Sequence, residues 1–165
     1  MLTSKTSSRI KVYYEVTKPK IWYLLVFTAF GAAFTAQNLY DVEVSPLTWI
    51  LLIGSVTAGS AAANTLTNYN DRDIDAIMDR TRDRPIPSKR IYPAEKALYF
   101  GLILAAISLA ASFAINIWAG LFMAFGLVDN ILVYSKLLKR RSQSNIVLGG
   151  FSGGAPALIG YVAVT

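Results

Sequence analysis

The chain has 165 residues, of which 54% are hydrophobic, and a formal net charge of +6. Its mean hydropathy is +0.43. It contains no cysteine and no histidine, which excludes disulfides, thiolate chemistry, Cys/His zinc sites and a histidine general base within these residues. Acid–base or metal chemistry must therefore use carboxylates, amides, tyrosines or water.

Long uncharged runs alternate with short charged segments along the chain. Residues 1–20 are polar and basic and lack a small-residue cleavage site, so they are expected to form a retained cytoplasmic segment. The rest, 21–165, is expected to form one transmembrane domain of an all-α polytopic membrane protein with about five membrane-spanning helices. The apolar runs are Ile21–Ala36, which is short for a span, Leu47–Leu66, Ala97–Ile115, Ile117 to about Tyr134 after a turn near Asn116, and Ile146–Thr165.

The basic residues predict the topology of these spans. All sixteen Lys and Arg lie before Ile21, between Arg72 and Lys96, or between Lys136 and Arg141. Five spans place these three segments on one side of the membrane, with cytoplasmic loops at about 68–96 and 135–145. The N-terminus is therefore expected in the cytoplasm, and the protein in the cytoplasmic membrane with the lipid bilayer as its partner. Because the positive charge is explained by topology, no nucleic-acid partner is expected.

The stretch Asn64–Arg84, NTLTNYNDRDIDAIMDRTRDR, has the most distinctive polar pattern. If the second apolar run continues as one helix, its two amides (Asn64 and Asn68) and three carboxylates (Asp71, Asp75 and Asp79) share an arc of roughly 80°. Stacked carboxylates repel unless a cation lies between them, and nearby arginines suit anionic oxygens, so the pattern fits a Mg²⁺-bound diphosphate. The alternative is a solvated, salt-bridged loop, because Asp and Arg alternate here.

Three further features have both a structural and a functional interpretation. The segment Tyr134–Asn145 is either a basic membrane anchor or a second wall for the same anion, with Lys139 and Arg140 facing the metal site. The glycines of 149–161 either allow close helix packing or let a bulky ligand approach. Asp129 is a lone carboxylate inside the fourth span, where an ionisable group is a functional candidate unless it lies near the interface.

Two ordered motifs resemble the UbiA superfamily of intramembrane prenyltransferases. NYNDRDIDAIMDRTRDRP resembles the first aspartate motif of that superfamily, and YSKLLKRRSQSNIVLGGFSGGAPALIGYVAVT resembles its tyrosine, Leu-Lys-Arg and Gly-Gly segment. TKPKIWYLLVFTAFGA resembles the entry to its first span. The resemblance covers the chain from Val16 onward and is strongest to the branch that farnesylates protoheme IX.

The resemblance implies roles for particular residues. Asp71 and Asp75 match the Mg²⁺-binding, catalytic aspartates, and Asn68 matches the amide beside them. The matching substrate-binding residues are Arg80 and Arg84, which trail the motif, and the basic pair Lys139 and Arg140, which holds diphosphate. Thr67 is a departure, because many members have asparagine there, and Asp129 has no assigned counterpart.

The activity implied is Mg²⁺-dependent transfer of a farnesyl group from farnesyl diphosphate to a vinyl group of heme b, after which water completes heme O. A heme-iron ligand would be a tyrosine, lie elsewhere in a longer protein, or be absent. One alternative is a UbiA-type enzyme acting on an aromatic acid or a glycerol phosphate. Alternatives of another class are a cation-coupled transporter, which predicts ionisable groups near the bilayer midplane, and a non-catalytic or inactive fragment.

The resemblance also implies a longer protein. Members of the superfamily have about nine spans and a second aspartate motif in their later half. The chain is therefore expected to be the N-terminal part of a longer protein or a truncated product, with a C-terminal half as its missing partner.

Overall fold

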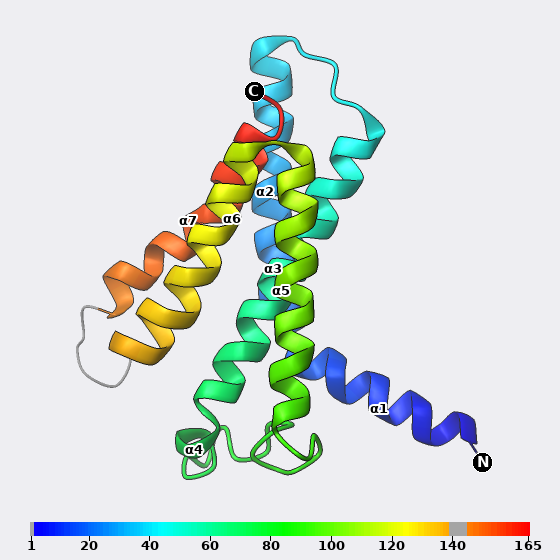
Figure 1. The fold of residues 1–165 in the computed structure, drawn as a ribbon, viewed down its shortest axis with the longest axis vertical. Coiled ribbons are helices and arrows are strands. Elements are labelled where there is room, and N and C mark those ends of the chain that lie inside the picture. The colour runs from blue at the N-terminus through cyan, green and yellow to red at the C-terminus, as the bar shows by residue number, and fades with distance from the viewer. Residues whose placement is uncertain (1, 139–144) are drawn as a thin grey trace.

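The computed structural model describes the backbone of residues 2–138 and 145–165 and the side chains of residues 8–135 and 150–165. Every regular element in these residues is a helix (Figure 1). In chain order the elements are α1 (Leu2–Val16), α2 (Pro19–Tyr40), α3 (Pro46–Asn70), the single turn α4 (Arg72–Asp75), α5 (Glu95–Ile115), α6 (Ile117–Val128), the π-helix η1 (Asp129–Leu138) and α7 (Asn145–Val162).

Four helices are long and apolar enough to cross a membrane within the described residues, which confirms the predicted fold class. They are Pro19–Tyr40, Pro46–Asn70, Glu95–Ile115 and the continuous rod Ile117–Ser135. The first of these corrects an expectation, because the run that looked short for a span extends to Tyr40. Polar residues near its end hid the last turn from the hydropathy pattern. Asn38 remains helical, and its side chain donates to the carbonyl of Phe34 at 2.7 Å.

The long helices form a closed bundle. Contacts link α2 to α3, α3 to α5, α5 to α6, and α6 to α7, and α7 returns to contact α2. Small residues allow the helices to approach closely. A side chain on Gly160 would overlap the backbone carbonyl of Ala29, so α7 and α2 require glycine at that crossing. A buried cluster that includes Leu52, Val56 and Ile159 fills the interior.

The predicted turn between the third and fourth spans has a local cause. Asn116 ends α5 and caps α6, where its side-chain oxygen accepts the Ala119 N–H at 2.8 Å. This confirms the turn near Asn116. The rod then continues through η1, in agreement with a fourth span that reaches Tyr134.

The helix through the aspartate row does not continue as predicted. α3 ends at Asn70, Asp71 lies outside helical geometry (φ −90°, ψ 1°), and α4 adds only one turn before a series of turns reaches α5. Asn, Asp and Thr side chains compete with the backbone for hydrogen bonds, which weakens a helix at such a stretch. At 25 residues α3 is about 38 Å long, which exceeds the roughly 30 Å hydrocarbon core, so its polar end projects beyond the apolar part of the bundle.

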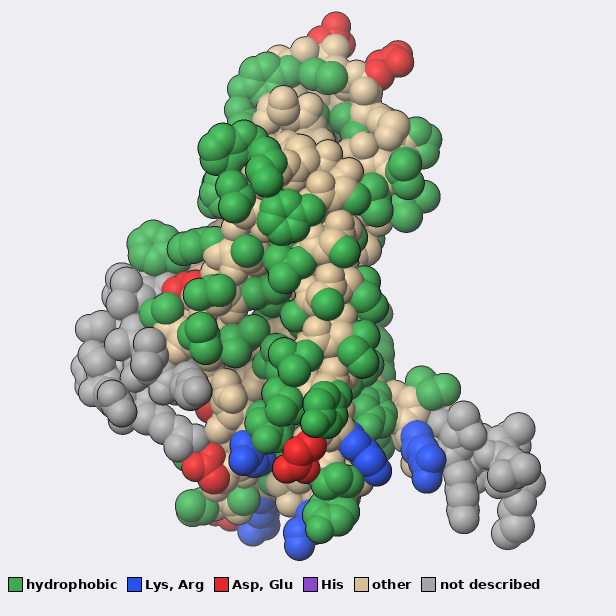
Figure 2. Space-filling model, in the orientation of Figure 1, with side chains coloured by type: hydrophobic (Ala, Val, Ile, Leu, Met, Phe, Trp, Pro, Cys, Tyr) green, Lys and Arg blue, Asp and Glu red, His purple; other side chains and the backbone are tan. Residues whose placement is uncertain are grey.

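Charge separates the two ends of the bundle. Figure 2 shows the Lys and Arg side chains at the end where α4 lies, whereas the charged side chains in view at the opposite end are acidic. We call the α4 end the basic end. The basic segments before Ile21 and between Arg72 and Lys96 therefore lie on the same side, as the sequence predicts.

Candidate functional site

Two carboxylates are buried at the basic end of α3. Asp71 and Asp75 are each only 4% exposed. They are one helical turn apart, and the Asp75 N–H donates to the Asp71 carbonyl at 2.8 Å. Because burying a carboxylate is costly, such groups are kept only where hydrogen bonds or cations compensate.

One compensating cation is Arg84. Its guanidinium donates to Oδ2 of Asp75 at 2.7 Å, and the two side chains are 29% and 6% exposed. The segment between them folds back through Thr81, whose buried hydroxyl donates to the Asp75 carbonyl at 3.1 Å. The trailing arginine of the motif therefore lies beside the second aspartate.

Asn68 adds a third polar group to this end of α3. Its side-chain nitrogen donates to the carbonyl of Val16 at 2.8 Å, which connects the site to the end of α1. Its side-chain oxygen is buried and accepts no hydrogen bond from the described residues. An acceptor without a donor is rare in a protein interior, and it is satisfied by water or a cation.

These donors fit a magnesium ion. Mg²⁺ prefers oxygen ligands and usually takes one or two protein carboxylates together with phosphate oxygens and water. Asp71, Asp75 and the Asn68 oxygen are such ligands on successive turns of one stretch. Within the described residues there is no group of three His, Cys, Asp or Glu that could hold a metal, so a site at this end would combine two carboxylates with other oxygen ligands.

The next part of the same run has a different environment. Asp79, which was predicted to share the face of Asp71 and Asp75, is 94% exposed and pairs with the exposed Arg82 at 3.1 Å. Asp73 and Arg80 are also exposed. The face prediction for Asp79 was wrong because it assumed an unbroken helix. Arg80 lies at the basic end but outside the buried pair, and Lys139 and Arg140 lie outside the described residues.

Asp129 is buried within the bundle, only 7% exposed. Its Oδ2 accepts the backbone N–H of Ser152 at 3.1 Å, and the neighbouring Asn130 donates to the Ser152 hydroxyl at 3.3 Å. These bonds join the start of η1 to α7. The sequence marked Asp129 as unusual, but nothing in it indicated this partner.

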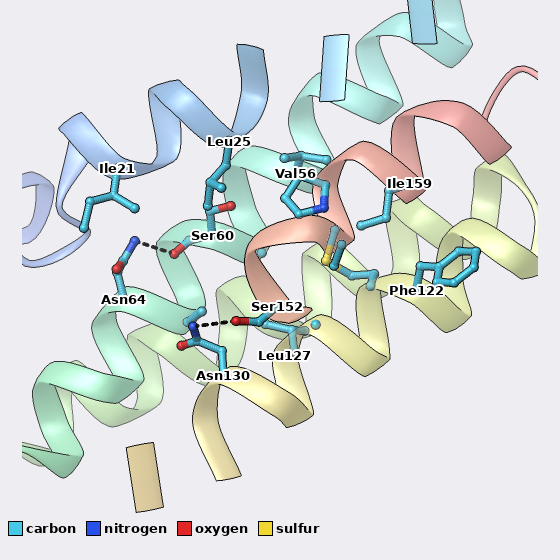
Figure 3. A pocket seen from close by; sticks show the side chains of 16 residues that line it. Ile21, Leu25, Val56, Ser60, Asn64, Phe122, Leu127, Asn130, Ser152 and Ile159 are labelled. Carbon is cyan, nitrogen blue, oxygen red and sulfur yellow. Dashed lines mark hydrogen bonds between the residues drawn. The ribbon is translucent and has the colours of Figure 1, made fainter. Parts of the chain in front are cut away.

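A mostly apolar pocket with a few polar side chains lies inside the bundle, among α2, α3, α6, η1 and α7 (Figure 3). Its volume is about 90 Å³, enough for a few water molecules. Asn64 and Ser60 line it from α3, while Asn130 and Ser152 face it from η1 and α7. Asn64 precedes Asp71 by seven residues, or about 10 Å of helix, and neither Asp71 nor Asp75 lines the pocket. Of its polar residues only Asn64 stood out in the sequence.

Residues 24–165 match the family model of the UbiA prenyltransferase family, and the chain belongs to that family. Among curated relatives, protoheme IX farnesyltransferase 2 of Cenarchaeum symbiosum is 58% identical over 100% of this chain and 56% of its own length. The protoheme IX farnesyltransferase of Thermoplasma volcanium is 50% identical over 96% of this chain and 54% of its own. The chain thus spans about half the length of the curated relatives it matches.

Solved structures agree with the fold. A chain from a structural study of digeranylgeranylglyceryl phosphate synthase in membranes has a TM-score of 0.85 and 25% identity, covering 95% of this chain and 54% of that one. A UbiA homologue from Archaeoglobus fulgidus bound to DMAPP and Mg²⁺ has a TM-score of 0.73 and 21% identity, covering 90% of this chain and 53% of that one. The family resemblance of the two sequence motifs is therefore confirmed.

Proposed function

We propose that the protein transfers a farnesyl group from farnesyl diphosphate to a vinyl group of heme b to make heme O, in a Mg²⁺-dependent reaction. The relatives named protoheme IX farnesyltransferase, at 58% and 50% identity, support the acceptor. The observation that carries the proposal is the burial of Asp71, Asp75 and the Asn68 oxygen on neighbouring turns of the chain, at the basic end of an apolar bundle. We further propose that this end faces the cytoplasm and that the N-terminus lies on the same side.

The residues of the basic end would bind the diphosphate. Asp71, Asp75 and Asn68 would hold Mg²⁺, which neutralises charge on the leaving diphosphate. Arg84 already lies against Asp75, and its partial exposure leaves guanidinium N–H groups for phosphate oxygens. We propose the same role for Arg80, Lys139 and Arg140. Preorganised donors of this kind stabilise negative charge as the allylic C–O bond breaks.

The apolar bundle would protect the reacting carbons. The farnesyl chain would extend from the carboxylates toward the interior, where apolar side chains exclude bulk water. The bond from the farnesyl carbon to the vinyl carbon leaves a positive charge on the porphyrin side chain. Addition of one water and loss of its proton then gives the hydroxyl group of heme O.

The test is product formation in membranes that carry the full-length gene product. Heme b, farnesyl diphosphate and Mg²⁺ should yield heme O, identified by mass spectrometry, and chelation of Mg²⁺ should abolish it. Transfer of the isoprenoid to an aromatic acid or a glycerol phosphate, with none to heme b, would refute the acceptor. The same assay on the Asp79→Asn variant is the matched control.

A further inference from the structure

An apolar groove on the outside of the bundle is lined by residues of α1, α3 and α5. Figure 1 shows that α1 leaves the bundle at an angle to the spanning helices. The volume of the groove is about 770 Å³, much larger than the pocket inside the bundle. Arg9 and Tyr13 line it from α1, Gly54 and Ala58 from α3, and Leu104 from α5. It is separate from the carboxylates of the candidate site.

The walls of the groove are fixed by contacts at the second half of α1. The rings of Tyr13 and Phe100 meet edge to face at 5.1 Å between centroids. Glu15 accepts two hydrogen bonds from Arg90, at 2.6 and 2.7 Å. Val16 is fully buried in a small cluster with the segment that precedes α5. The angle between α1 and the spans is therefore set by the fold, and the groove is preformed.

The groove reaches a level of the spanning helices that is about one leaflet from their start at the basic end. Leu104 lies nine residues after Glu95, the first residue of α5, which is about 14 Å along the helix axis. Half of a hydrocarbon core is about 15 Å. On α3 the space beside Gly54 is open, since a Cβ added to this glycine would meet nothing within 4 Å. A single lipid chain is a ligand that suits an apolar hollow at this level.

The mouth of the groove is cationic and aromatic. Arg9 lines this opening, is exposed and forms no ion pair with any described residue. Tyr14 and Trp22 border the same opening, with ring centroids 6.4 Å apart. Aromatic rings of this kind mark the headgroup level of a membrane, and arginine is a strong ligand for phosphate.

We propose that this groove binds one anionic phospholipid, with its phosphate at Arg9 and one chain lying along α3 and α5. The apolar walls exclude a free phosphate as the occupant. The site holds α1 against the membrane surface and does not depend on the proposed prenyl transfer.

The test measures lipid retention by native mass spectrometry of the intact protein, released from detergent that contains equal phosphatidylglycerol and phosphatidylcholine. We expect one retained lipid and about a fivefold preference for phosphatidylglycerol, the scale of one basic residue at a membrane surface. Equal retention of the two lipids would overturn the proposal.

Two pairs of variants separate the groove from general effects. Gly54→Leu fills the groove, and because each excluded CH₂ costs about fourfold in affinity we expect retention to fall by about tenfold or more. Gly31→Leu is its control, since Gly31 also has open space around it but does not line the groove. Arg9→Gln should remove the phosphatidylglycerol preference, whereas Lys11→Gln, which changes a charge outside the groove, should keep most of it.

Two results would contradict the site. One is that the Gly54→Leu and Gly31→Leu variants retain equal amounts of lipid. The other is displacement of the lipid by equimolar farnesyl diphosphate without Mg²⁺, which would assign the groove to a prenyl diphosphate. Because lipid retention needs no catalysis, failure of heme O synthesis would leave this proposal standing.

Discussion

Asp75 and Asp79 lie four residues apart in one alternating run of Asp and Arg, and each pairs with an arginine. The Asp75–Arg84 pair is 6% and 29% exposed, with 2.7 Å between its atoms. The Asp79–Arg82 pair is 94% and 61% exposed, with 3.1 Å between its atoms. The sequence alternative of a solvated, salt-bridged loop thus describes the part of the run at Asp79, whereas Asp75 is buried, as the proposed metal site requires.

The difference follows from where α3 ends. Because Asp71 leaves helical geometry, the chain folds back through Thr81 and buries Asp75, while the turn that carries Asp79 extends into solvent. Isolated exposed ion pairs contribute about 0–1 kcal/mol, whereas breaking a buried pair costs about 3–5 kcal/mol. We therefore expect changes at the Asp75–Arg84 pair to lower activity or stability. Equivalent changes at the Asp79–Arg82 pair should have almost no effect on either.

The largest difference should appear in catalysis. Asp75→Asn keeps the shape of the side chain but removes its charge, and we expect a loss of about 100-fold or more in prenyl transfer, the scale of one lost contact to developing charge. Asp79→Asn should stay within about twofold, since Asp79 is solvated. Initial rates of heme O formation measure both. Equal losses in the two variants would break the distinction between the pairs.

The next difference concerns stability. Arg84→Gln leaves the buried Asp75 carboxylate without its cation, and we expect a loss of about 2 kcal/mol, less than for a fully buried pair because Arg84 is 29% exposed. Arg82→Gln should cost about 0.5 kcal/mol or less. The free energies of unfolding of the two variants, measured in mild detergent, test this difference. A larger effect at Arg82 than at Arg84 would contradict the burial argument.

A smaller effect is expected at the hydroxyl that closes the turn. Thr81→Val conserves volume but removes the bond to the Asp75 carbonyl, which should cost about 1 kcal/mol because Thr81 is 2% exposed. Ser88→Ala is the control, since its hydroxyl bonds to the Arg84 carbonyl at 2.6 Å in an exposed position. The same unfolding assay should show less than about 0.5 kcal/mol for that control.

The smallest effect depends on pH. The hydrogen bond from Arg90 lowers the pKa of Glu15 below its ordinary value of 4.5, and burial opposes that shift only in part. Stability from the pair is therefore present above about pH 4.5 and is lost as the pH falls through the lower pKa of the folded protein. Glu15→Gln should flatten this part of the acid unfolding profile. An unchanged profile would show that the pair does not anchor α1.

Spans and turns were predictable because they depend on local patterns. The lengths of the apolar runs predicted the spanning helices. Asn116 both ends α5 and caps α6. The buried site was only partly predictable. Asp71, Asp75 and Asn68 could be chosen from their spacing and the family resemblance.

The end of α3 at Asn70 and the bonds from Thr81 and Ser152 could not be predicted. They depend on tertiary folding of the chain around Asp75 and Asp129, and helical periodicity carries no information about such contacts.

Equilibrium binding of farnesyl diphosphate, without any acceptor, tests the assignment of the buried carboxylates most directly. With Mg²⁺ present, we expect Asp75→Asn to weaken binding by about tenfold or more, the scale of one charged hydrogen bond, while Asp79→Asn binds like the unaltered protein. Chelation of Mg²⁺ should weaken binding by the unaltered protein to the level seen with Asp75→Asn. Unchanged binding in Asp75→Asn, with or without Mg²⁺, would contradict the assignment of this site.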